Sequence, residues 1–306
     1  MLPRTMRPPL LIAIAVTLIT WASAFVAIRH AVRGFPPGSL ALVRFAIAST
    51  VLALYVYAIR RRAPRRLERR DLPGFAIIGV VGFLVYHVAL NAGERTVSAG
   101  AASLLINTGP IWTAMIATAL LGERLGARGW LGMSVAFVGA ALVSVGSAGG
   151  LRFDGDVALV FIASVAQAVY FVLQKPYLTR YGAVDATCYA VWIGTLLLLP
   201  FASEAVSAFA TASSAEIASA VYLGVFPGAI GYLTWTYTLA HMPASRAASL
   251  LYLVPFIVFV IAWSLLGESP GWLSIAGGLP ILIGVALVNS ERAAARPAQG
   301  AAPART

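Results

Sequence analysis

The chain has 306 residues, of which 60% are hydrophobic and 11% are charged, and its formal net charge is +11. Together with a mean hydropathy of +0.86, this composition excludes an ordinary soluble domain. The single cysteine, Cys188, excludes an intramolecular disulfide and any multi-cysteine metal site, and we expect neither a metal nor another cofactor.

Apolar segments of about twenty residues recur along nearly the whole chain, and each is long enough to cross a hydrocarbon core of roughly 30 Å as a helix. We therefore predict an all-α polytopic membrane protein with ten transmembrane helices. The predicted spans lie near residues 10–30, 37–59, 72–92, 98–121, 127–146, 156–176, 184–202, 216–240, 244–267 and 271–289.

The first span begins like a secretory signal, because Arg4 and Arg7 precede the apolar run and a small-x-small cleavage site follows at 22–24. The apolar run continues to Ile28, however, and the segment belongs to an internal repeat. A retained first span is therefore favoured over a cleaved signal.

The two halves of the chain repeat each other. Ala-Ala-Ser-Leu-Leu stands at 101–105 and again at 247–251, and a proline follows each copy, at Pro110 and Pro255. The offset between the copies is 146 residues before the prolines and 145 after them, so one single-residue gap aligns the whole block. A duplication of this size in so apolar a chain is typical of transporters built from two membrane bundles.

The predicted boundaries place the first five-helix repeat at 1–147, the second at 148–291 and a disordered cytoplasmic tail at 292–306. Because five is an odd number, the second repeat must be inserted opposite to the first. We expect a two-fold axis in the membrane plane to relate the halves, with a transport site between them.

Basic residues, nearly all of them arginine, concentrate in alternate loops. The richest is the second loop, with Arg60, Arg61, Arg62, Arg65, Arg66, Arg69 and Arg70. The positive-inside rule places this loop and both termini in the cytoplasm, where the arginines face anionic lipid rather than nucleic acid. By the same rule the segment at 203–215 is an external loop.

Short motifs at matching places in the two halves carry a family resemblance. Leu-Gly-Glu occurs at 121–123 and at 266–268, downstream of the two prolines, within a duplicated ten-span layout. Over residues 10–290 the chain resembles EamA-type members of the drug/metabolite transporter superfamily, and it looks most similar to YddG-type bacterial amino-acid exporters. The resemblance implies a small-metabolite exporter of the bacterial inner membrane with a central cavity, and a monomer is the expected state.

Four residues lie near the middle of their spans, where inverted repeats usually place their site. They are Trp21, Asn107, Gln167 and Tyr252, and Gln167 is the repeat partner of Trp21. Polar side chains at this depth are costly when they face lipid, so we expect them to face the interior. The alternative is that the amides bond neighbouring helices and the aromatic rings fill the core.

Two further residues complete the candidate substrate-binding set. His87 shares a helix face with Phe83 and Asn91, and a histidine bonded between helices is the alternative there. Trp235 lies on an aromatic and polar face of the eighth span. Aromatic faces with a few amides suit a partly apolar solute better than a sugar phosphate.

Charged side chains are expected to stay out of the cavity. Glu94, Glu123 and Glu268 fall at span ends, so we predict transport that needs no membrane carboxylate. Coupling through histidine and facilitated movement both remain open. Arg44 lies close to the outer end of its span and is expected to extend outward to the interface, with a place in the cavity as the alternative.

Pro110 and Pro255 fall near the middle of the fourth and ninth spans. Each proline leaves the carbonyl four residues before it, at Ile106 and Leu251, without its helical donor. We predict that both spans break there and act as gating elements. The alternative is a static kink that shapes the bundle.

These features predict broad-specificity export of aromatic or neutral zwitterionic amino acids by alternating access. The expected partners are the amino acid and the lipid bilayer. One alternative keeps the class and changes the solute, to a drug or a nucleobase. A polytopic membrane enzyme is the alternative of another class, but the chain lacks His-Glu-x-x-His, a P-loop and Gly-x-Ser-x-Gly.

Overall fold

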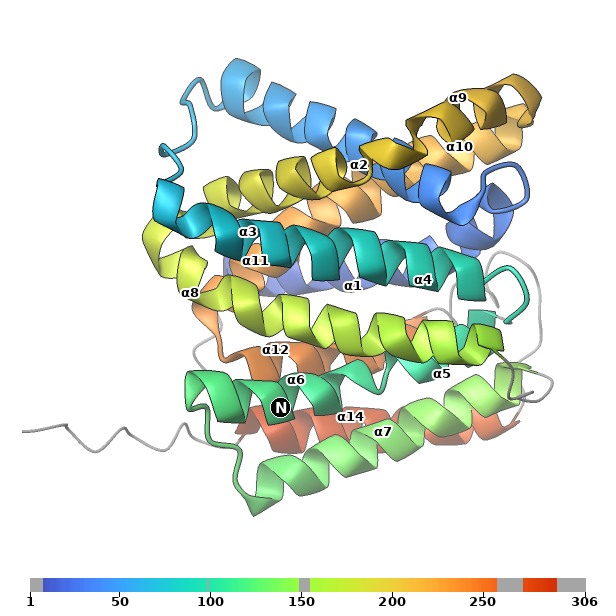
Figure 1. The fold of residues 1–306 in the computed structure, drawn as a ribbon. Coiled ribbons are helices and arrows are strands. Elements are labelled where there is room, and N and C mark those ends of the chain that lie inside the picture. Colours follow the sequence, from blue (N-terminus) through green and yellow to red (C-terminus); the bar gives the residue numbers. More distant parts are fainter. Residues whose placement is uncertain (1–7, 98, 149–154, 258–271, 291–306) are drawn as a thin grey trace, which may run out of the picture.

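The computed structural model describes residues 8–97, 99–148, 155–257 and 272–290. Within these ranges nearly every residue is helical and no strand is present (Figure 1). The all-α polytopic fold predicted from the apolar segments is thereby confirmed. The end of the ninth predicted span lies outside the described residues.

Helices of the first half follow the first five predicted spans. Their bounds are α1 (Pro8–Ala31), α2 (Pro37–Leu54) with a π-helical turn at Tyr55–Ile59, α3 (Leu72–Gly79) joined through π-helix Val80–Val85 to α4 (Tyr86–Gly93), α5 (Ala99–Ile106), α6 (Gly109–Leu121) and α7 (Ala127–Ala148). A short 3-10 turn at Arg69–Asp71 precedes α3.

The second half follows a similar layout, but two of its predicted spans are joined in one element. Its elements are α8 (Gly155–Leu197), the 3-10 turn Leu199–Phe201, α9 (Ala202–Thr211), α10 (Ser214–Leu223), the π-helix Gly224–Gly231, α11 (Tyr232–His241), α12 (Ala244–Ser249), the 3-10 turn Leu250–Tyr252 and α14 (Trp272–Ser290). α8 holds both the sixth and the seventh predicted spans, which meet at Gly182 with φ 76° and ψ 169°. Glycine tolerates this positive φ because it has no Cβ.

The prediction of an external loop at 203–215 is wrong in conformation, because most of this segment is helical. Its alanine-rich sequence has a high helix propensity. The chain leaves the helix only at Ala212 and Ser213, and Ser213 and Glu216 then form a capping box that starts α10. Charge bias reports on the side of the membrane and says nothing about conformation.

The fifth and tenth spans, α7 and α14, pack closely at one edge of the bundle (Figure 1). A Cβ on Gly132 would lie 2.7 Å from the carbonyl oxygen of Gly284, and a Cβ on Gly139 would lie 2.7 Å from that of Gly277. The contacts run in opposite order along the two helices, so α7 and α14 are antiparallel. This is the relation that an inverted five-helix repeat requires.

Candidate functional site

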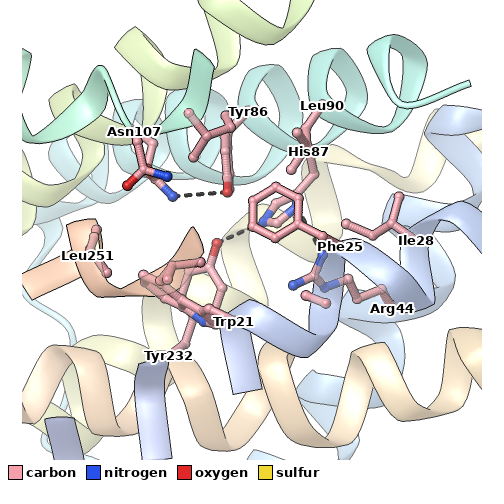
Figure 2. Close-up of a pocket in the computed structure, with 14 residues that line it drawn as sticks. Trp21, Phe25, Ile28, Arg44, Tyr86, His87, Leu90, Asn107, Tyr232 and Leu251 are labelled. Carbon is pink, nitrogen blue, oxygen red and sulfur yellow. Dashed lines mark hydrogen bonds between the residues drawn. The ribbon is translucent and has the colours of Figure 1, made fainter. Parts of the chain in front are cut away.

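A cavity lies inside the bundle, and both repeats contribute to its wall. Its lining is mostly apolar, with a few polar side chains. The residues that line it are Trp21, Ala24, Phe25, Ile28, Arg44, Tyr86, His87, Leu90, Ile106, Asn107, Gln167, Tyr232, Leu251 and Val254. Figure 2 shows Arg44 and His87 on one side and Asn107 on the other, with the hydroxyl groups of Tyr86 and Tyr232 between them.

Four of the six predicted binding residues, Trp21, His87, Asn107 and Gln167, line this cavity. α1 supplies Trp21, α4 supplies His87 and α8 supplies Gln167, while Asn107 stands directly after α5. Their spans bring them together from distant parts of the chain. A role in binding substrate stays a prediction for each of them.

Trp235 and Tyr252 do not line the cavity. Trp235 lies one helical turn after Tyr232 and packs behind Trp21, with 5.3 Å between the ring centroids. Tyr252 is fully buried and its ring faces Phe137 on α7, at a centroid distance of 6.5 Å. Depth along a span does not reveal direction around it: Leu251 and Val254 line the cavity, whereas Tyr252, next to Leu251, points elsewhere.

Arg44 contradicts the expectation that it extends outward. Its side chain is only 3% exposed and lines the cavity, where Nη1 lies 3.4 Å from Nδ1 of His87. The eighth span packs closely against this part of α2, because a Cβ on Gly224 would lie 2.8 Å from the Arg44 carbonyl oxygen. The inward position could have been expected from the sequence, because an arginine that faces lipid within a span is costly.

Hydrogen bonds fix polar lining residues on both sides of the cavity. On one side, His87 Nε2 lies 2.7 Å from the Tyr232 hydroxyl. On the other, Gln167 Nε2 donates to the Tyr86 hydroxyl at 2.9 Å, and Asn107 Nδ2 donates to the Ser103 carbonyl at 2.7 Å. Tyr86 and Tyr232 were missed in the sequence, where aromatic side chains are too common to single them out.

The fourth span is broken as predicted. α5 ends at Ile106 and α6 begins at Gly109, with Pro110 in its first turn. The Ile106 carbonyl accepts a hydrogen bond of 3.3 Å from Ser164 Oγ, so a neighbouring helix replaces the missing donor. In the ninth span a 3-10 turn at Leu250–Tyr252 precedes Pro255. Gating at either proline stays a prediction.

One end of the bundle is closed by contacts that Glu123 makes. Its carboxylate accepts hydrogen bonds from the backbone nitrogens of Ala244 and Ser245 at 2.7 and 3.0 Å, and lies 3.7 Å from Nζ of Lys175. Lys175 also donates to the carbonyls of Leu239 and Met242. Glu123 therefore fixes the start of α12. Glu268, the third acidic residue considered, lies outside the described residues.

Aromatic rings lie between this closed end and the cavity. Trp21 stacks on Phe171 of the second repeat, with centroids 5.9 Å apart and planes 5° apart. Phe171 in turn packs on Trp235 at 4.4 Å. The cavity thus has a floor of aromatic side chains from both halves.

Comparison with known proteins assigns the family. The model of the EamA-like transporter family matches residues 8–145 and 156–290. The chain belongs to this family. It is a multi-pass membrane protein with two EamA copies, and the resemblance seen in its paired motifs is confirmed. The finer likeness to YddG-type exporters stays a prediction.

Relatives in other organisms are named as transporters. The chain is 41% identical over 293 residues to a "Probable terminal-alkyne amino-acid exporter" of Streptantibioticus cattleyicolor, covering 96% of this chain and 97% of the relative. It is 35% identical to the "Uncharacterized transporter YdfC" of Bacillus subtilis, covering 87% and 86%. It is 24% identical to a "Probable amino-acid metabolite efflux pump" of Escherichia coli, covering 88% and 90%.

A crystal structure of a protein with 19% sequence identity superposes with a TM-score of 0.72, covering 92% of this chain and 96% of the other. At this identity the similarity concerns the fold alone. It agrees with the helical bundle described above.

Proposed function

We propose that this transporter exports amino acids with apolar or aromatic side chains across the bacterial inner membrane. The observation that carries the proposal is the composition of the cavity. Trp21, Phe25 and Leu90 offer apolar surface, while the polar groups are confined to a few positions. Such a lining binds a partly apolar solute with few directional contacts, which favours broad specificity.

The relative from Streptantibioticus cattleyicolor supports the solute class, because its name specifies an amino acid with a terminal alkyne and its sequence matches nearly the full length of this chain. A terminal alkyne is a small, linear, mostly apolar group. The apolar wall that includes Ile106, Leu251 and Val254 suits a side chain of this kind. We include such amino acids in the proposed range.

In this proposal the charge bias sets the topology, and the relatives named as an exporter and as an efflux pump support the outward direction. The arginine-rich second loop and both termini lie in the cytoplasm in this proposal, and solute moves outward by alternating access through the cavity. The end closed by Glu123 and Lys175 is then the cytoplasmic end.

A transport assay in proteoliposomes tests the proposal. Radiolabelled L-norvaline, L-phenylalanine and L-propargylglycine are supplied separately, with and without a proton gradient, and uracil serves as the nucleobase control. We expect saturable movement of the amino acids and no movement of uracil. If no amino acid moves, or if none competes with a solute that does move at millimolar concentration, the proposed solute class is wrong.

A further inference from the structure

The cavity contains a buried guanidinium with unused hydrogen-bond donors. Arg44 Nε has no hydrogen-bond partner, and Nη1 reaches only the ring of His87. Glu94 is close enough to interact electrostatically with Arg44, yet neither of its carboxylate oxygens has a hydrogen-bond partner. A buried cation without a bonded anion is costly. This side chain is therefore placed to gain much from an anion that enters the cavity.

The tautomer of His87 leaves the hydroxyl of Tyr232 as a second hydrogen-bond donor in the cavity. Because a guanidinium can only donate, Nδ1 of His87 must accept from Arg44, so Nε2 carries the ring proton. That proton is donated to the Tyr232 oxygen at 2.7 Å. The hydroxyl hydrogen of Tyr232 then remains available on the cavity side, and the bond that its oxygen accepts makes it a stronger donor.

The opposite side of the cavity presents acceptors instead. Gln167 uses its amide nitrogen on Tyr86 and leaves Oε1 without a partner. Asn107 uses its amide nitrogen on the backbone carbonyl of Ser103, which leaves the amide oxygen for the cavity. Figure 2 shows Asn107 facing Arg44 across the Tyr86 and Tyr232 hydroxyls.

We propose that Arg44 and Tyr232 bind the carboxylate of the transported solute, while the amide oxygens of Gln167 and Asn107 receive its ammonium group. This inference rests on the proposed function and specifies which side chains bind the two charged groups of a zwitterion. A guanidinium and a hydroxyl can donate to the two oxygens of one carboxylate. The side chain of the solute then lies against the aromatic and aliphatic wall. We therefore expect the site to accept many side chains and to require the carboxylate and the ammonium group.

The test compares solutes that differ only at the carboxylate. Competition against labelled L-norvaline is measured in proteoliposomes with L-norvaline and with L-norvalinamide, whose carboxylate is a neutral amide. For the native protein we expect the amide to compete at least about tenfold more weakly, as loss of a charge-assisted hydrogen bond predicts. In Arg44→Gln we expect norvaline competition to weaken about tenfold or more, with little change for norvalinamide.

Matched variants separate this role from general effects of charge. Arg33→Gln removes a positive charge from an exposed position outside the cavity lining, and we expect native behaviour. Tyr232→Phe removes one donor and keeps the charge, so it lowers the norvaline preference a few-fold. If a folded Arg44→Gln keeps the native preference for norvaline over norvalinamide, the carboxylate site is refuted. If Arg44→Gln does not fold, an unchanged preference in Tyr232→Phe refutes it.

A second measurement distinguishes failure of the proposed function from failure of the carboxylate site. Binding of pentanoate, a carboxylate without an amine, is followed as a rise in the unfolding temperature of detergent-solubilised protein. If the native protein moves no amino acid but pentanoate stabilises it, and not Arg44→Gln, the solute class fails and the carboxylate site stands. If pentanoate leaves both unfolding temperatures unchanged, the site fails as well.

Discussion

Asn107 and Gln167 show what depth along a span can and cannot predict. Their positions near the middle of the membrane were enough to place them at the cavity. The same reasoning misplaced Tyr252, because a 3-10 turn and the 100° step between neighbouring residues decide which way a side chain points. It also missed the inward direction of Arg44, whose side chain lines the cavity beside His87, a residue of another span. Direction around a helix needs tertiary contacts.

Replacing either cavity amide with leucine removes an acceptor from the cavity. We expect Asn107→Leu and Gln167→Leu each to lower efflux per folded molecule about tenfold, because an ammonium group would lose its partner. Asn289→Leu is the control, since Asn289 is a buried amide on α14 that bonds Ser249 outside the cavity lining. Efflux and folded protein are measured separately. Native efflux in both cavity variants would remove these amides from the site.

Glu94 follows directly after the third span, and burial raises its pKa well above the ordinary value, against the opposing influence of Arg44 and Arg29. The pKa of Glu94 is higher in the folded protein than in the unfolded chain. As pH rises from the unfolded value towards the folded value, ionisation of Glu94 therefore destabilises the folded protein. We expect Glu94→Gln to raise the unfolding temperature at pH 8 and to change it little at pH 4. Thermal unfolding in detergent at both values checks this.

The same variant tests transport without a membrane carboxylate. Glu94→Gln is a cleaner choice than a variant that also replaces Glu123, because Glu123 holds the start of α12. We expect Glu94→Gln to retain efflux. Loss of all transport from a folded and correctly inserted Glu94→Gln protein would show that the carboxylate takes part.

At the scale of elements, the sequence predicted the spans well and the segments between them less well. Apolar length is a property of the chain itself, so the bounds of α1 and α7 agree with the predicted spans to within a few residues. The break between α5 and α6 was also predictable, because Thr108, Gly109 and Pro110 are poor helix formers in sequence. The helical character of α9 was missed because the expectation rested on charge bias, which carries no information about conformation, and not on the alanine-rich sequence.

Proline at the breaks has a mechanical consequence that substitution can test. In Pro110→Ala the new N–H can donate to the Ile106 carbonyl and join α5 to α6, in competition with Ser164. We expect turnover in Pro110→Ala and Pro255→Ala to fall several-fold more than the apparent affinity changes. Pro280→Ala is the control, as Pro280 lies within α14 outside the cavity lining. Parental turnover in both variants would contradict a hinge.

At the scale of the whole molecule, topology is the prediction most easily checked. A cysteine introduced as Arg65→Cys is expected to react with a membrane-impermeant reagent only from the cytoplasmic side, and one introduced as Arg33→Cys only from the outside. The native Cys188 is buried and gives a low background. Labelling of Arg65→Cys from the outside alone would reverse the proposed orientation.

The close contact of α7 and α14 has a consequence for how the molecule moves. The repeat offset of 145 residues carries Gly132 to Gly277 and Gly139 to Gly284, so it converts each glycine contact into the other. If alternating access exchanges the conformations of the two repeats, the same two glycine contacts are present before and after the exchange. The packing of α7 on α14 can therefore persist through the whole transport cycle.

The ion pair of Lys175 and Glu123 has no such invariance, because the repeat carries these residues to Arg29 and Glu268. A contact that maps onto a different set of residues distinguishes one state from the other and must break during the cycle. We therefore expect the glycine seam to stay in contact during alternating access, while the contact between Lys175 and Glu123 opens.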